Sequence, residues 1–447
     1  MNIIADLHLH SKYSRAVSQK MDINYITHWA QIKGLNLVAT SDWTHPVWLS
    51  QLKNDLKETS PGIFTPKKSL KSNINFILST EISCIYSQDG QTRRIHLVVL
   101  APSFTTVEKI NLKLLAKGIN LASDGRPILG LSAKNLLSLL LEVDKNCFVI
   151  PAHVWTPWYS LYGSKSGFNS LNECFGNLSK HIHSVETGLS SDPSSNWQIE
   201  ELQNRSIVSF SDAHSGPKLA REATILSISD NNISYDKIIS ALKSPSNYQL
   251  PQTPTTDSKI LFTIEFYPEE GKYHYTGHRK CQISQNPAQT KNAGIICPVC
   301  GKPLTVGVLQ RIQDLSSVSI NDNNLKTHKI GKFAKGFSFK NRPPYIKLVP
   351  LQEIIAQCLN TSPATKKVAG QYDLLINSFD NELNILINTS LKEIEKVSGP
   401  RIAQAISKVR VGDISIDPGY DGQFGKVTLW PQKNNPNNQQ QDQMTLF

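Results

Sequence analysis

Short apolar segments alternate with amphipathic helical patterns along the first 250 residues of the chain. The apolar segments are rich in Val, Ile, Leu and Phe, which predicts strands, and the segments between them repeat apolar residues at helical spacing. The expected strands are Asn2–Leu9, Asn36–Thr40, Ile74–Ile82, Ile95–Ala101, Cys147–Ala152, His183–Glu186, Ile207–Ser211 and Thr224–Ser227. The expected helices are Ile23–Ile32, Val107–Leu121, Asn135–Val143 and Tyr235–Leu242. Such alternation is typical of a mainly parallel sheet or an (α/β) barrel.

The residues after the first strand favour the barrel. A doubly wound sheet usually opens with a Gly-rich turn, whereas Asp6-Leu-His-Leu-His occupies that place here. Pro245, Pro251 and Pro254, with Ser and Thr around them, mark a linker near residue 250. We therefore predict an α/β fold with a (β/α) barrel in the first part of the chain. The expected divisions are the barrel domain (1–250), a small module with four possible metal ligands (259–325), a basic, mainly helical region (326–432) and a flexible Asn- and Gln-rich tail (433–447).

Composition excludes several classes of protein. The 447 residues leave room for roughly two to four domains, and 39% hydrophobic with 19% charged residues is typical of a soluble globular chain. No window approaches the ~18 uninterrupted apolar residues of a membrane span, so no membrane partner is expected. The N-terminus shows no basic region or cleavage site of a secretory signal, and seven cysteines do not suit a disulfide framework. We expect a cytoplasmic, nucleoid-associated protein.

The positive charge is concentrated in the C-terminal part. The net charge is +11; residues 1–258 carry 24 basic and 21 acidic groups, and residues 259–447 carry 23 and 15. Residues 326–347 hold seven Lys or Arg and no acid, interleaved with Phe and Tyr. Lysines that meet phosphates beside aromatics that stack on bases are typical of a nucleic-acid surface, although a solvated loop with core-facing aromatics has the same composition. The expected DNA-binding residues are Lys329, Lys332, Lys335, Lys340 and Arg342.

Histidines and carboxylates recur at predicted strand ends. His8 and His10 lie two apart, and Asp212 and His214 repeat that spacing about 200 residues later. Barrels of this class place their active sites at strand ends, so the recurrence predicts a metal centre. The further members are Glu81 at the end of a strand, His96 at the start of one and His153 just after one.

A second metal site is predicted from cysteine spacing. The chain has His-x2-Cys at His278 and Cys281, then Cys-x2-Cys at Cys297 and Cys300. This spacing fits a closed, tetrahedral structural zinc site, which would stabilise a module too small to fold around its own core.

The metal-centre motifs resemble those of the PHP (polymerase and histidinol phosphatase) domain, a distorted β/α barrel of metal-dependent phosphoesterases. Longer motifs resemble one branch, the endonuclease Q family of DNA repair enzymes, over about residues 1–430. They include Thr40-Ser-Asp-Trp-Thr-His-Pro, Pro151-Ala-His-Val-Trp-Thr-Pro-Trp, Gly163-Ser-Lys-Ser-Gly-Phe, Glu186-Thr-Gly-Leu-Ser-Ser-Asp-Pro, Arg342-Pro-Pro-Tyr and Pro418-Gly-Tyr-Asp-Gly.

The resemblance implies two divalent catalytic cations, of zinc, manganese or iron, with magnesium as a possible activator. His8, His10, Glu81 and Asp212 would hold the first cation, and Glu81, His96 and His153 the second, with Glu81 as the bridge. The chain departs from the three-metal PHP pattern, because Trp43 stands where a further histidine is usual. His214 is then a general acid or an outer-shell group, and Asp42 orients a ligand or binds metal itself.

The implied activity is hydrolysis of duplex DNA on the 5′ side of deaminated bases (uracil, hypoxanthine, xanthine) and abasic sites. The alternative is a small-molecule phosphoesterase such as a histidinol-phosphate phosphatase, which shares the barrel but has no need of a zinc module. Candidates for stacking on or wedging beside the lesion are Trp155, Trp158, Tyr159 and Trp197, with structural packing as the alternative. Val397-Ser-Gly-Pro-Arg-Ile weakly resembles half of a helix-hairpin-helix, and an ordinary turn between helices explains it equally well.

The C-terminal peptide predicts a protein partner. Gln443, Met444, Leu446 and Phe447 resemble the Gln-Leu-x-Leu-Phe peptide that binds the bacterial sliding clamp, with Met in place of the first Leu. The archaeal and eukaryotic clamp motif fits less well, because its second terminal aromatic is absent. We expect a DNA sliding clamp, of the bacterial β type, as partner.

Overall fold

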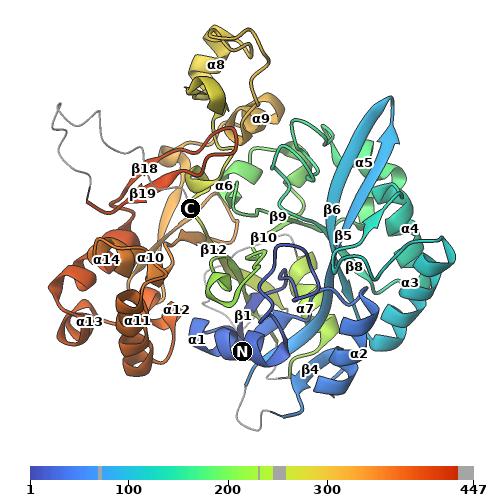
Figure 1. Ribbon diagram of the computed structural model, residues 1–447, viewed down its shortest axis with the longest axis horizontal. Coiled ribbons are helices and arrows are strands. Elements are labelled where there is room, and N and C mark those ends of the chain that lie inside the picture. The colour runs from blue at the N-terminus through green and yellow to red at the C-terminus, as the bar shows by residue number, and fades with distance from the viewer. Residues whose placement is uncertain (69–72, 230–231, 245–257, 431–447) are drawn as a thin grey trace.

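One mixed β-sheet runs through the described part of the chain, which comprises residues 1–68, 73–229, 232–244 and 258–430 of the computed structural model (Figure 1). Its strands follow the order β15-β16-β17-β12-β11-β1-β2-β5-β4-β3, and β6, β7 and β8 attach beyond β5. The N-terminal strands of this sheet are β1 (Asn2–Asp6), β2 (Leu37–Ala39), β3 (Leu56–Ser60), β4 (Ile63–Pro66), β5 (Asn75–Gln88), β6 (Gln91–Ala101), β7 (Ile128–Leu129), β8 (Phe148–Pro151) and β11 (Ala223–Ser227). The later ones are β12 (Lys259–Glu265), β15 (Lys326–Ile330), β16 (Ala334–Ser338) and β17 (Tyr345–Lys347). A separate parallel pair is β9 (Ser184–Glu186) with β10 (Ser206–Val208).

The sheet is mixed rather than mainly parallel. β1, β2 and β5 are parallel, as the strand–helix alternation predicts, but β5 and β6 form a long antiparallel hairpin and β11 runs antiparallel to β1. Alternation along the chain does not reveal these pairings, because β5 and β6 follow one another through a two-residue turn at Asp89 and Gly90. The predicted α/β class is confirmed.

Helices cover the sheet, and several begin at capping side chains that the sequence shows. Asp22 accepts a hydrogen bond from the Tyr25 N–H at the start of α1, and Gly34 ends that helix at φ 91°. The main helices of this part are α1 (Ile23–Lys33), α2 (Pro46–Asp55), α3 (Phe104–Ala116), α4 (Ala133–Val143), α5 (Leu171–Phe175), α6 (Pro193–Asn196) and α7 (Tyr235–Lys243).

Apolar side chains from many strands meet in one cluster, here called the inner core, which α7 closes. Alternate residues of β1, Ile3 and Ala5, belong to it, as expected for one face of a strand. Its other strand members are Leu37, Ile63, Ile77, Val98, Leu100, Phe148, Ile150, Val208, Leu226 and Ile260. Convergence of so many strands on one core fits the predicted distorted barrel.

A small module and a helical region follow the catalytic part (Figure 1). The module holds β13 (Thr276–His278), β14 (Ile283–Gln285), α8 (Pro287–Ala293) and α9 (Val308–Leu315). The helical region holds α10 (Leu351–Cys358), α11 (Lys366–Phe379), α12 (Glu382–Ile387), α13 (Leu391–Ser398) and α14 (Pro400–Val411), followed by the hairpin of β18 (Ser415–Asp417) and β19 (Lys426–Thr428). A buried ion pair, Lys33 with Glu382 at 2.5 Å, ties α1 to α12.

The region expected to be basic and mainly helical begins with strands. Residues 326–347 form three strands that extend the main sheet through β17 and β12, and the helices begin at Leu351. The proposed linker prolines and the clamp-like peptide Gln443–Phe447 lie outside the described residues. Within the described ranges, no helix has the length and apolar character needed to cross a membrane.

Candidate metal centre

The inward faces of two neighbouring strands carry apolar residues at one end and metal-ligand side chains at the other. On β5, Ile77 lies in the inner core and Glu81 follows on the same face. On β6, Val98 is paired with Glu81 and belongs to the inner core, and His96 lies two residues before it. Because β6 is antiparallel to β5, His96 is a diagonal neighbour of Glu81 on that face. The expectation that Glu81 ends a strand and His96 opens one is therefore wrong, since both lie in the middle of long strands.

The other ligand candidates lie where the chain leaves its strands. His8 and His10 follow the end of β1, and Leu9 between them forms a bridge to Ala213. Three of the residues predicted for the metal centre have left-handed backbone, Asp42 with φ 42°, His153 with φ 32° and Asp212 with φ 47°. Such conformations are uncommon for residues other than glycine and often occur at functional sites.

Glu81 stands at the centre of the cluster. Its Oε1 lies 2.7 Å from His96 Nδ1, 3.1 Å from His153 Nε2 and 3.6 Å from His8 Nε2. Its Oε2 lies 3.3 Å from His10 Nε2. The carboxylate thus reaches both sets of histidines, as expected for a bridging ligand.

Asp212 lies on the side of the cluster that His8, His10 and His214 form. Its Oδ1 lies 3.1 Å from His10 Nε2, 3.6 Å from His8 Nε2 and 3.7 Å from His214 Nδ1. Potential ligand atoms within 4.8 Å of one another form three groups here: His8, His10 and Glu81; Glu81, His96 and His153; and His10, Asp212 and His214. The geometry therefore brings together all six predicted ligands of two sites and places His214 beside them.

The donor set suits a divalent cation. His8 Nε2, His10 Nε2 and Asp212 Oδ1 are buried without a hydrogen-bond partner among the described residues, and buried polar atoms normally have one. Burial would raise the pKa of Glu81, but His96, Arg126 and His8 hold it well below its usual range. Burial likewise opposes ionisation of Asp212, and His8 and His10 lower its pKa. Two ionised carboxylates among imidazole nitrogens form a typical site for zinc, manganese or iron.

Outer partners orient the imidazoles. Nδ1 of His8 lies 2.9 Å from Glu186 Oε1, and the His153 N–H donates to Glu186 Oε2 at 2.8 Å. Nδ1 of His10 lies 3.2 Å from Asp42 Oδ1, and Asp42 Oδ2 accepts from the Ser11 N–H at 2.7 Å. Both carboxylates lie on the ring nitrogen opposite the cluster, so Asp42 orients a ligand in this arrangement.

Sequence reasoning missed two residues of the centre. Glu186 begins the motif Glu186-Thr-Gly and ends a predicted strand. The sequence does not reveal its contact with His8, because the two residues lie 178 positions apart. Gly188 comes two residues after Glu186. A Cβ at this position would lie 2.3 Å from the Cβ of His153, so only glycine fits at the end of the Glu-Thr-Gly motif. Arg126 donates from Nη1 to Glu81 Oε2 at 2.9 Å, and no pattern in the sequence marks this loop arginine.

The second metal site also assembles. The ligand atoms of His278, Cys281, Cys297 and Cys300 all lie within 4.8 Å of one another, with Cys300 Sγ 3.4 Å from His278 Nδ1. His278 lies at the end of β13 and Cys281 in the turn after it, whereas Cys297 and Cys300 form the Cys-x2-Cys knuckle. Helix α8 lies between these two pairs in the sequence. Three thiolate donors and one imidazole form a closed tetrahedral set that suits zinc.

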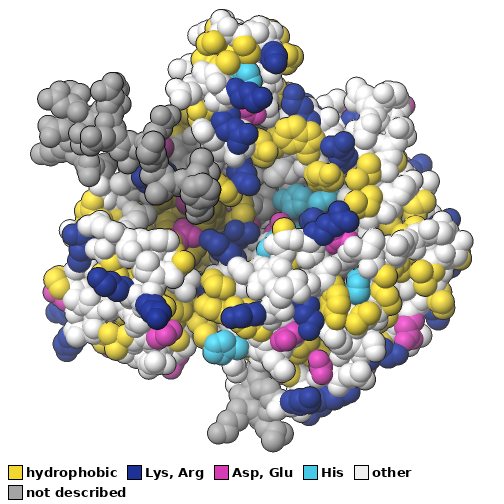
Figure 2. Space-filling view, viewed as in Figure 1, with side chains coloured by type: hydrophobic (Ala, Val, Ile, Leu, Met, Phe, Trp, Pro, Cys, Tyr) yellow, Lys and Arg dark blue, Asp and Glu magenta, His cyan; other side chains and the backbone are white. Residues whose placement is uncertain are grey.

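The five predicted DNA-binding residues differ in their exposure to solvent. Lys329, Lys332, Lys335 and Lys340 are exposed on or beside β15 and β16. Arg342 is instead buried: its Nη2 donates to Gln203 Oε1 at 2.9 Å. Figure 2 shows histidines in a hollow near the centre of one face, with Lys and Arg side chains around it.

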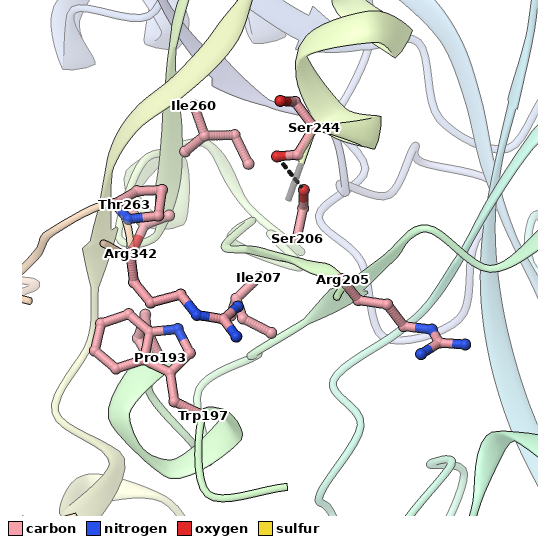
Figure 3. Close-up of a pocket in the computed structure, with 10 residues that line it drawn as sticks. Pro193, Trp197, Arg205, Ser206, Ile207, Ser244, Ile260, Thr263 and Arg342 are labelled. Atoms are coloured by element: carbon pink, nitrogen blue, oxygen red, sulfur yellow. Dashed lines mark hydrogen bonds between the residues drawn. The ribbon is translucent and has the colours of Figure 1, made fainter. Parts of the chain in front are cut away.

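Arg342 lines a small recess (Figure 3). Trp197 lies in the wall of the same recess and is 2% exposed, and Trp155 is 1% exposed and donates to Asn196. These two tryptophans are packed structurally, which leaves Trp158 and Tyr159 as the partly exposed candidates.

Comparison with known proteins connects this geometry to one family. A family profile described as the MJ0043 C-terminal domain matches residues 350–413. The uncharacterized protein MJ0043 of Methanocaldococcus jannaschii is 33% identical over 290 residues, which cover 64% of this chain but only 32% of that protein. The crystal structure of the lesion-specific endonuclease from Pyrococcus furiosus has a TM-score of 0.78 and 29% identity, over 96% of this chain and 95% of that one. Endonuclease Q in complex with a 27-mer duplex carrying an abasic lesion at the active site has a TM-score of 0.79 and 30% identity, over 96% of both chains.

The chain belongs to the endonuclease Q family. The match to endonuclease Q covers 96% of this chain and therefore extends over its N-terminal part, the cysteine module and the helical region. The predicted family and fold class are thereby confirmed.

Proposed function

We propose that this protein is a DNA repair endonuclease that hydrolyses the phosphodiester bond 5′ of deaminated bases and abasic sites. Family membership makes the chain a metal-dependent enzyme that hydrolyses DNA. The endonuclease Q complex with an abasic lesion at its active site, matched over 96% of both chains, is the observation that carries the proposal. It argues against a small-molecule phosphoesterase, which would need neither the cysteine module nor the helical region.

His8, His10, Glu81 and Asp212 would hold one cation, and Glu81, His96 and His153 a second. Cations bound by these residues would supply charge stabilisation for the phosphodiester oxygens and would lower the pKa of a bound water. The ionised carboxylates of Glu81 and Asp212 supply the negative charge that binds the cations, and Glu186 and Asp42 fix the ring orientation of His8 and His10.

Two further side chains have places in the reaction. His214 is partly exposed, at 34% of its side chain, and its Nδ1 lies 2.9 Å from the Asp212 carbonyl oxygen. That contact fixes the Nδ1–H tautomer, so protonated His214 can give a proton from Nε2 to the leaving oxygen. Arg126 is 26% exposed beside Glu81, where the unused N–H groups of its guanidinium can bind the substrate phosphate.

The four-residue cysteine and histidine site would hold one structural zinc, and the exposed lysines of β15 and β16 would meet DNA phosphates. Lys335 Nζ lies 5.0 Å from the Phe337 ring and Lys340 Nζ lies 5.1 Å from the Phe339 ring, so charge and aromatic surface alternate here. The peptide Gln443–Phe447 would bind a sliding clamp; deleting it should abolish clamp retention in a pull-down and leave incision of naked DNA unchanged.

The direct test is incision of labelled duplexes that carry one uracil, hypoxanthine, xanthine or abasic site, with zinc, manganese, iron or magnesium supplied in turn. Cleavage 5′ of the lesion, with an undamaged duplex of the same sequence left intact, is the expected result. Release of phosphate from histidinol phosphate without any DNA incision would favour the alternative.

A further inference from the structure

The loop between β18 and β19 is held firmly against the segment that leads into the cysteine module. Its glycines approach that segment closely: a Cβ on Gly425 would lie 2.2 Å from the Glu269 carbonyl oxygen. Its hydrogen bonds include Gly419 N–H to Glu269 O (2.8 Å), Tyr275 N–H to Gly419 O (2.9 Å), Gly422 N–H to Lys272 O (2.9 Å), Gly425 N–H to Glu270 O (3.0 Å), Arg279 N–H to Asp421 Oδ2 (2.7 Å) and Thr305 Oγ1–H to Asp421 Oδ1 (2.7 Å). The loop therefore presents its remaining side chains on a rigid support.

This rigid loop holds Phe424 in solvent. Phe424 is 71% exposed, more than any other large hydrophobic side chain in the described part of the chain. Lys272 Nζ lies 4.5 Å from the centre of its ring, within the range of a cation–π contact. The ring is thus left out of the core although the backbone that carries it is held in place.

The surroundings of Phe424 suit DNA better than an apolar protein surface. Lys272, Arg279 and Lys426 are exposed around the loop. The acidic side chain within the loop, Asp421, is engaged by two hydrogen bonds, and the exposed Asp417 is paired with Lys426 across the hairpin. An exposed aromatic ring beside cations offers a stacking face for a base together with charge for the flanking phosphates.

Aromatic residues lie between the loop that carries Phe424 and the metal centre. A Cβ on Gly422 of the loop would lie 3.8 Å from Tyr273 Oη. Tyr273 packs edge-on against Trp158 with ring centres 5.5 Å apart. The residue after Trp158, Tyr159, lies 4.7 Å from the ring of His96, one of the candidate ligands. Both Trp158 and Tyr159 are partly exposed.

We propose that Phe424 is a wedge that enters the base stack beside the lesion and fills the space left when the damaged nucleotide is unstacked. This inference rests on the proposed function. Opening a stacked, paired base is costly, and an apolar side chain inserted between base steps offsets that cost. Phe424 would therefore matter most where the lesion lies in a fully paired duplex, and little where the base is already unstacked.

The test compares two substrates. One duplex carries a single uracil that is fully paired, and the other carries the same uracil inside a three-nucleotide mismatched bubble. Phe424→Ala should lower incision of the paired duplex by about tenfold or more, and incision of the bubble by less than about threefold. Phe424→Trp should retain incision of both, and Leu112→Ala, which removes another exposed hydrophobic on α3, should change neither.

A binding signal provides a readout independent of cleavage. With 2-aminopurine opposite the uracil, fluorescence should rise when the wild-type protein binds, and the rise should be lost with Phe424→Ala. Equal loss of incision on both substrates, or wild-type rates on both, would overturn the wedge. Failure of the wild-type protein to cut either duplex would instead contradict the proposed function.

Discussion

His8 Nδ1 lies 2.9 Å from Glu186 Oε1 at the back of the metal centre. A carboxylate oxygen accepts, so the proton of His8 sits on Nδ1 and the lone pair of Nε2 faces Glu81 and Asp212. Through His8 and the backbone of His153, Glu186 fixes one ligand of each proposed cation site. Glu186 is therefore a positioning residue.

Replacing Glu186 should weaken metal binding without removing a ligand. Glu186→Ala should lower metal affinity by about 10- to 100-fold, the usual effect of losing a carboxylate behind a ligand histidine. Competition with a chromophoric chelator measures this change, and Glu186→Gln should recover part of it because its carbonyl oxygen can still accept. The exposed Glu200→Gln serves as control. Wild-type affinity in Glu186→Ala would remove this role.

A buried ion pair predicts an acid-dependent loss of stability. Lys347 Nζ of β17 lies 2.8 Å from Asp192 Oδ2. Burial would raise the pKa of Asp192, but Lys347 and nearby hydroxyl and N–H donors lower it to about 2, below its ordinary 3.8. Because the pKa is lower in the folded state, the pair's contribution is complete above about pH 4 and is lost as the pH falls toward 2.

Asp192→Asn should lower the free energy of unfolding by on the order of 2 kcal/mol at pH 6, and the difference from wild type should shrink below pH 4. Chemical denaturation at several pH values measures it, with the exposed Asp417→Asn as control. A difference that stays constant from pH 6 to pH 3 would show that the ion pair does not cause the loss.

The sequence predicted which residues form the metal centre better than it predicted where those residues lie in their strands. Recurring histidines and carboxylates beside apolar runs indicated a metal centre, and the family resemblance implied the six candidate ligands that the structure brings together. The patterns placed Glu81 and His96 at strand ends, since only pairing shows that β5 and β6 continue past them as a hairpin. Arg126 could not be found, because its role depends on a loop that reaches Glu81 from 45 residues away.

The basic stretch shows a similar limit. Its composition identified an exposed lysine surface, but charge alone does not distinguish Arg342, whose guanidinium is anchored on Gln203, from the lysines. The pattern also did not predict the three strands of residues 326–347, because β15 (Lys-Thr-His-Lys-Ile) and β16 (Ala-Lys-Gly-Phe-Ser) are not apolar runs.

The cysteine module predicts a structural zinc. Cys297→Ser should reduce zinc content by one atom per chain, measured by atomic emission on the purified protein, and should make residues 259–325 more sensitive to protease. Cys358→Ser, at a buried cysteine outside the cluster, should leave the zinc content unchanged. Unchanged zinc in Cys297→Ser would disprove the assignment.

The exposed lysines predict how DNA binding depends on salt. Each phosphate contact contributes about 0.9 to the slope of log affinity against log salt on duplex DNA. Replacing Lys332, Lys335 and Lys340 together with Ala should flatten that slope and weaken binding to damaged and undamaged duplexes alike. Replacing the exposed Lys57, Lys109 and Lys117 should do neither. If both triple variants keep the wild-type slope, DNA lies elsewhere.

The central claim is that Glu81 bridges two catalytic cations, and metal content and incision measured on the same Glu81→Gln protein test it most directly. The variant keeps the shape of the side chain but lacks its charge, which lies within 3.6 Å of four imidazoles. We expect bound catalytic metal to fall and incision beside an abasic site to drop by at least about 1,000-fold, while duplex binding persists. A folded Glu81→Gln protein that keeps both cations and cuts at the wild-type rate would contradict the account.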